Sequence, residues 1–161
     1  MNALNYGDEL ASPAANAVQL VAFSVGEQTY AVEITSVREI RAWNGATPLP
    51  NTRDYVRGVI NLRGTIVPIF DLRVRFGEGQ TSPTRTHVVV VMASGPKWVG
   101  VLVDAVSDIL TISAEDIHPV PAGNALESDL LKGIVTHDDR MVALIDLAAV
   151  VSADRLERVT A

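Results

Sequence analysis

Apolar residues in this chain come in short blocks, separated by polar or glycine-containing pairs. Each block has the length of a β-strand, and the blocks are 18–25, 30–34, 58–62, 66–72, 87–92, 99–103, 133–135 and 141–147. Several separating pairs suit a tight reversal between neighbouring strands, and these pairs are Gly26-Glu27, Arg63-Gly64, Gly95-Pro96 and Asp138-Asp139. The pattern therefore predicts a series of antiparallel β-hairpins.

The second half of the chain repeats the pattern of the first half. The matched segments are 57–72 with 132–147, 30–40 with 99–109, and Pro48-Leu49-Pro50 with Pro119-Val120-Pro121. Each copy is then a unit of about five short strands, and so small a sheet avoids exposed edges best by closing into a barrel. We predict an all-β fold with short helices, built from two five-stranded barrels packed side by side.

Domain boundaries follow from the same pattern, with a weak break at the Gly-, Ser-, Thr- and Pro-containing segment 77–84. The expected units are a flexible tail over 1–17, a folded region over 18–152 with a first barrel of about 18–80 and a second of about 84–147, and a tail or short helix over 153–161. An exchange of strands between the two halves is left open.

Short helical turns are expected beside the strands of each copy. Asp71 and Asp146 stand where an N-cap residue would accept backbone N–H groups, and Gly77 stands where a C′ residue would end the turn. The one-turn spacing of apolar residues also predicts a helical turn at 34–37 and another at 103–106.

Composition and charge exclude several classes of protein. The formal net charge of -6 argues against a nucleic-acid partner, because neutralising phosphates requires a dominantly basic surface. The absence of cysteine excludes disulfides and thiolate metal sites. The longest apolar run, 88–93, is far shorter than the roughly 20 residues that cross a bilayer, and the N-terminus lacks a signal-peptide pattern. We expect a cytoplasmic protein without direct membrane insertion.

No group of residues in the sequence is typical of catalysis or of a bound cofactor. The candidates are His87, His118 and His137, the pairs Asp104 with Asp108 and Asp138 with Asp139, and Gly77-Glu78-Gly79. The histidines lack metal-ligand spacing, the acidic pairs suit turns and caps, and the glycine segment lacks the context of a phosphate loop. We predict no enzyme activity, metal or cofactor; a small β-barrel ligand-binding protein is an alternative.

Arginine is concentrated in the first half of an otherwise acidic chain. These residues are Arg38, Arg41, Arg53, Arg57, Arg63, Arg73 and Arg75. They form either an ordinary solvated surface or a patch that meets an acidic protein face through bidentate carboxylate contacts.

Three segments resemble the CheW family: Val37-Arg38-Glu39-Ile40, then 57–73, then 100–109. The resemblance covers about residues 18–152 and implies two SH3-like barrels. It also implies a non-enzymatic adaptor that couples methyl-accepting chemoreceptors to the histidine kinase CheA in receptor arrays. The implied partners are the chemoreceptor cytoplasmic tips, the regulatory domain of a CheA-type kinase, and further CheW copies. The alternative is a stand-alone CheW-like regulator that competes for the same receptor or kinase sites.

The resemblance further implies which residues meet each partner. Those carried over for the receptor, in a groove between the barrels, are Val37, Glu39, Gly58 and Arg63. Those considered for the kinase are Leu49, Gly64, Ala122, Gly123 and Leu126. The alternative for Val37 is a place in the barrel core, and for Glu39 with Arg63 it is a surface ion pair. We interpret Trp43 as covering the barrel rim, with an exposed interface anchor as its alternative.

Overall fold

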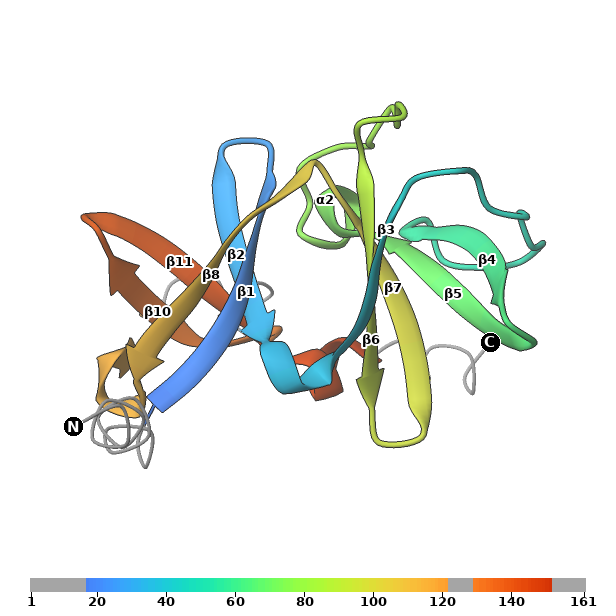
Figure 1. Ribbon diagram of the computed structural model, residues 1–161. Helices are drawn as coiled ribbons and strands as arrows, with labels where there is room; N and C mark the ends of the chain where they lie inside the picture. Colours follow the sequence, from blue (N-terminus) through green and yellow to red (C-terminus); the bar gives the residue numbers. More distant parts are fainter. Residues whose placement is uncertain (1–16, 122–128, 152–161) are drawn as a thin grey trace.

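The computed structural model describes residues 17–121 and 129–151, in which two β-sheets lie side by side (Figure 1). The strands are β1 (Ala17–Val25), β2 (Gln28–Glu33), β3 (Val37–Ala42), β4 (Val56–Leu62), β5 (Thr65–Asp71), β6 (Val88–Ser94), β7 (Lys97–Val103), β8 (Ala105–Ser113), β9 (Ile117–His118), β10 (Leu131–His137) and β11 (Arg140–Ile145). The short helical elements are η2 (Ile34–Ser36), α2 (Leu72–Arg75), η3 (Ala114–Asp116) and residues 147–151. The predicted fold class, all-β with short helices, is confirmed.

The two sheets do not follow the two halves of the sequence. One sheet has the strand order β8-β1-β2-β11-β10-β9 and is called barrel A, and the other has the order β3-β6-β7-β5-β4 and is called barrel B. The division expected near residues 80–84 therefore does not separate the sheets. Each copy contributes its first hairpin, β1–β2 or β6–β7, to the sheet formed by the other copy, so the halves exchange strands.

The exchange covers both faces of the two hairpins, which are apolar on each side. On β1, Leu20 and Ala22 point into the core of barrel A, while Phe23 points into a core shared by both barrels. On β6, Val89 points into the core of barrel B, and Val90 points into the shared core. Strands that are apolar on both faces must be covered on both, and the position between the barrels provides this cover.

The internal repeat of the sequence is also a repeat of strand pairing. Gly58 pairs with Ile69 in the β4–β5 hairpin, and Gly133 pairs with Leu144 in the β10–β11 hairpin, each directly after a bulge. The second strand of each hairpin then pairs in parallel with a strand of the exchanged hairpin, β5 with β7 and β11 with β2. The two barrels are therefore related element by element.

Each barrel is closed by a short segment that follows its edge strand. In barrel B, Thr47 forms a bridge with Val59 of β4. In barrel A, His118 of β9 pairs in the same way with Ile134 of β10. In the sequence repeat, Thr47 aligns with His118 and Val59 aligns with Ile134, so the two closures are equivalent.

Most of the predicted helical turns are present. Asp71 caps α2 by accepting a hydrogen bond from the Arg73 N–H, Gly77 follows the helix with φ +77°, and Asp146 accepts from the Ala149 N–H. Residues 34–36 form η2, but the turn predicted at 103–106 is wrong. The chain there makes only a bend at Asp104, because it passes directly from β7 of barrel B into β8 of barrel A.

Parts of the expected tails lie outside the described residues. Ala17 belongs to β1, whereas 1–16 and 152–161 are not described. Within the described ranges, no helix has the length and apolar content to span a membrane.

Candidate functional site

Val37 lies on the seam between the two barrels. It is the first residue of β3, it pairs with Met92 of β6, and it packs against the shared core while remaining partly exposed. Val37 therefore has features of both roles expected from the sequence, a residue of the receptor groove and a core residue. One side of it contacts the core, and the other reaches the surface. A partner that lies along the seam would contact this exposed side.

Glu39 and Arg63 form an ion pair that joins the edge strand β3 to the β4–β5 turn. The Arg63 Nη2 lies 2.8 Å from the Glu39 Oε1, and Arg41 Nη1 lies 3.8 Å from the Glu39 Oε2. The Arg63 side chain is 72% exposed, so this pair contributes little to stability. The structure therefore brings Glu39 and Arg63 together at the surface, beside Arg41, another member of the arginine group in the first half of the chain.

Gly58 serves the closure of barrel B. A Cβ added to this residue, which has φ +143°, would lie 2.3 Å from the carbonyl oxygen of Thr47. No side chain fits there without moving the closing segment. Intramolecular packing is thus a sufficient reason for glycine at this position, independent of any bound partner.

The β4–β5 turn carries Gly64, one of the residues considered for kinase contact. Arg63 and Gly64 have φ +51° and +93°, as a type I′ hairpin turn requires, and the Asn61 Oδ1 accepts a hydrogen bond from the Gly64 N–H at 2.7 Å. Leu49 is 46% exposed in the segment between β3 and β4. The remaining kinase candidates, Ala122, Gly123 and Leu126, lie outside the described residues.

Large exposed apolar side chains occupy equivalent positions of the two barrels. Ile40 on β3 corresponds to Ile109 on β8, and Ile66 on β5 corresponds to Met141 on β11; each is at least 45% exposed. Isolated exposed apolar residues are common, but their recurrence at repeat-equivalent positions is not explained by barrel packing. Each barrel therefore exposes large apolar side chains at the same two positions.

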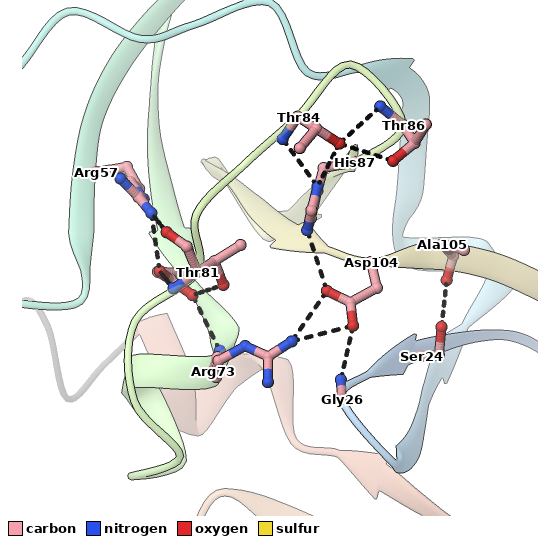
Figure 2. Close-up of polar contacts among 11 residues, drawn as sticks. Ser24, Gly26, Arg57, Arg73, Thr81, Thr84, Thr86, His87, Asp104 and Ala105 are labelled. Carbon is pink, nitrogen blue, oxygen red and sulfur yellow. Dashed lines mark hydrogen bonds and ion pairs between the residues drawn. The ribbon is translucent and has the colours of Figure 1, made fainter.

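Asp104 connects the two barrels at the point where the chain crosses from β7 to β8 (Figure 2). Its carboxylate accepts from the Gly26 N–H of the β1–β2 turn at 2.7 Å and from the Arg73 Nη2 of α2 at 3.0 Å. The Nε2 of His87, just before β6, lies 3.3 Å from the same carboxylate. From the sequence, Asp104 suited only a turn or cap role, because its partners in the fold come from distant segments.

Asp71, two residues before Arg73, anchors the segment that follows α2. It is 1% exposed and accepts hydrogen bonds from the Thr81 N–H and Oγ1. The Arg57 Nη2 lies 3.5 Å from this carboxylate and also donates to the Thr81 carbonyl. Arg57 and Arg73 thus form ion pairs within the protein. Arg38 and Arg63 are among the arginines of barrel B that are exposed to solvent.

Trp43 follows β3 and is only partly exposed. Its side chain packs against the core of barrel B, and its backbone N–H donates a hydrogen bond to the His87 carbonyl at 2.9 Å. This is the position of a rim residue, as predicted.

The described residues contain no group of three or more His, Asp or Glu side chains placed to hold a metal ion. The charged side chains described above pair with other residues of the protein. Together with the exposed apolar side chains, they give the protein a surface that suits contacts with other proteins.

Comparison with known proteins agrees with this arrangement. The model of the CheW-like domain matches residues 19–155. A probable chemotaxis protein CheW of Rhizobium etli is 44% identical over 158 residues, covering 98% of this chain and 96% of the relative. The chemotaxis protein CheW of Rhizobium meliloti is 44% identical over 140 residues, covering 86% of this chain and 90% of the relative.

A solved structure has the same architecture. The crystal structure of the scaffolding protein TtCheW from Thermoanaerobacter tengcongensis superposes with a TM-score of 0.75 at 32% sequence identity, covering 81% of this chain and 84% of that one. Sequence and structure together place this chain in the family of CheW-like domain proteins.

Proposed function

We propose that this chain is a non-enzymatic adaptor of bacterial chemotaxis, which couples chemoreceptors to a CheA-type histidine kinase in cytoplasmic arrays at the membrane. The observation that carries the proposal is the recurrence of exposed apolar side chains at equivalent positions of the two barrels, in a member of the CheW-like family. An adaptor must hold two partners at once. Two barrels that expose apolar side chains, joined through a shared core, provide more than one docking surface for that task.

The receptor tip is proposed to dock along the seam, on Val37, Glu39 and Arg63. A helical hairpin tip presents an apolar stripe with charges at set positions, so its binding site needs an exposed aliphatic residue with charged residues at its rim. The partly exposed Val37 and the Glu39–Arg63 pair supply these two elements on one strand and the adjoining turn. Gly58 acts in this proposal only by keeping barrel B closed.

The kinase regulatory domain is proposed to dock on barrel B through the β4–β5 turn and the segment between β3 and β4. Leu49 is exposed in that segment, and Gly64 at the turn leads into the exposed Ile66. Apolar residues beside a turn can be buried by a partner at little conformational cost. Ala122, Gly123 and Leu126, which lie outside the described residues, are proposed for the same kinase contact.

The test is a binding assay with two partners, a receptor signalling-tip fragment and the kinase regulatory domain, followed by kinase autophosphorylation in the presence of both. The adaptor function predicts a ternary complex and receptor control of the kinase that depends on this protein. Binding to one partner only would instead indicate a competitor for that site. Binding to neither would mean that the chain shares only the fold of the family.

A further inference from the structure

An open cleft in barrel B lies beside the Glu39–Arg63 pair. Its volume is about 430 Å³, and it lies between the edge strands β3 and β4. Its apolar side includes Ala46, Val59 and Val89, and its polar side includes Arg41, Asn44 and Asn61. The Asn61 Oδ1 already accepts from the Gly64 N–H, so the hydrogen-bonding group that Asn61 can offer to a ligand is its Nδ2 donor.

The cleft lies where barrel B has a charged and a small residue at two positions that hold large aliphatic residues in barrel A. Arg41 pairs with Val89 on β6 as Leu110 pairs with Leu20 on β1, so Arg41 occupies the place of a buried leucine.

Ala46, beside the closing residue Thr47, occupies the place of Ile117, which packs against the core of barrel A. Replacing two core aliphatic residues by a cation and a methyl group forfeits apolar burial. Such departures from good packing are characteristic of functional sites.

The charge beside the cleft is not balanced. Glu39 is shared between Arg63, at 2.8 Å, and Arg41, at 3.8 Å. One carboxylate therefore faces two guanidinium groups, and the weaker contact is made by Arg41, which lines the cleft. A second carboxylate entering the cleft would balance this charge, and arginine is the residue best suited to hold it.

We propose that this cleft binds the side chain of a glutamate from the receptor tip that docks beside it, on Glu39 and Arg63. The carboxylate is held by Arg41 and the amide groups of Asn44 and Asn61, and the methylene groups lie against Ala46 and Val59. This proposal rests on the proposed function in one respect: the glutamate is supplied by a docked partner protein. It gives the arginine-rich first half of the chain a specific use.

The first experiment needs no partner. The probe is N-acetyl-glutamate methylamide, titrated into the ¹⁵N-labelled full chain, with N-acetyl-glutamine methylamide as its uncharged control. The glutamate probe should shift the amide signals of Ala42, Asn44 and Asn61, saturating at a dissociation constant on the order of millimolar. Glu39→Gln should tighten this binding, because it removes the competing carboxylate. Equal shifts with both probes, or no saturation, would overturn the proposal.

Two variants restore the packing of barrel A within barrel B. Ala46→Ile fills the cleft without changing charge, and Arg41→Leu with Ala46→Ile restores both core residues. Each should abolish probe binding, and the double variant should unfold at a higher temperature than the wild type because it buries more apolar surface. Retained probe binding in the folded double variant would contradict the site.

The second experiment uses the receptor-tip fragment and the kinase regulatory domain. Ala46→Ile should weaken the binding of the receptor-tip fragment, which docks beside the cleft, by roughly tenfold or more. Unchanged affinity for that fragment would refute a receptor glutamate in the cleft. If the wild type binds neither protein, the adaptor function fails by itself, and the probe titration alone decides whether the carboxylate site exists.

Discussion

Gly58 and Gly133 occupy the same position in the two barrels, each against the carbonyl group that closes its barrel. A Cβ on Gly58 would lie 2.3 Å from the Thr47 oxygen, and one on Gly133 would lie 2.7 Å from the His118 oxygen. The repeat thus conserves a glycine within one molecule for a packing reason. This separates the structural demand at Gly58 from any role in receptor binding.

Alanine at either glycine should destabilise the protein by about 2 kcal/mol or more, because the closing segment must move away from the new methyl group. The measurement is chemical denaturation of Gly58→Ala and Gly133→Ala. Gly45→Ala is the matched control, since Gly45 also has a positive φ, of +90°, but an added Cβ would meet nothing within 4 Å. Should Gly58→Ala retain wild-type stability yet lose receptor binding, the assignment of Gly58 to barrel closure would be wrong.

Asp104→Asn should loosen the connection between the barrels. The neutral amide loses the ion pair with Arg73 and changes the contact with His87, and the loss of a charged hydrogen bond costs about 1–3 kcal/mol. The measurement combines denaturation with hydrogen exchange, in which the Gly26 amide should exchange faster.

Asp108→Asn is the control for this change, because the exposed Asp108 carboxylate accepts only from the neighbouring Ile109 N–H in the contacts described. Equal stability and equal Gly26 exchange in the two variants would show that Asp104 does not hold the barrels together.

Charge reversal at Arg63 should separate binding from stability. Arg63→Glu places a carboxylate beside Glu39, yet the exposed position limits the change in unfolding free energy to about 1 kcal/mol. Receptor-tip binding should fall in this variant and recover in part when Glu39→Arg is added, as a double-mutant cycle measures. The same affinity in all four proteins would remove the pair from the receptor site.

Val37→Ala should reduce receptor affinity more than it reduces stability. Val37 is partly exposed on the seam, whereas Val90 in the shared core is 0% exposed. Val90→Ala, the control, should cost about 2 kcal/mol or more in unfolding free energy. A similar loss of stability in both variants, with receptor binding unchanged for Val37→Ala, would make Val37 a core residue.

Local signals in the sequence were sufficient for the elements and for parts of the site. Strand-length apolar blocks, turn pairs such as Arg63-Gly64, and the cap residue Asp71 act over a few residues, so their effects can be recognised without tertiary structure. The contact between Glu39 and Arg63 was not predictable in this way. It depends on how β3 approaches the β4–β5 turn across the mouth of barrel B.

The duplication, the all-β class and the resemblance to the CheW family were determined by the sequence alone, because repeats and motifs are properties of residue order. Tertiary structure alone decided that each first hairpin, β1–β2 or β6–β7, joins the sheet of the other half. The residue order does not specify which sheet will cover a strand that is apolar on both faces. It likewise decided the role of Asp104, whose contacts with Gly26 and Arg73 join three segments that are far apart in the chain. The cleft at Arg41 became recognisable when the strand registers showed that Arg41 in barrel B is equivalent to the buried Leu110 in barrel A.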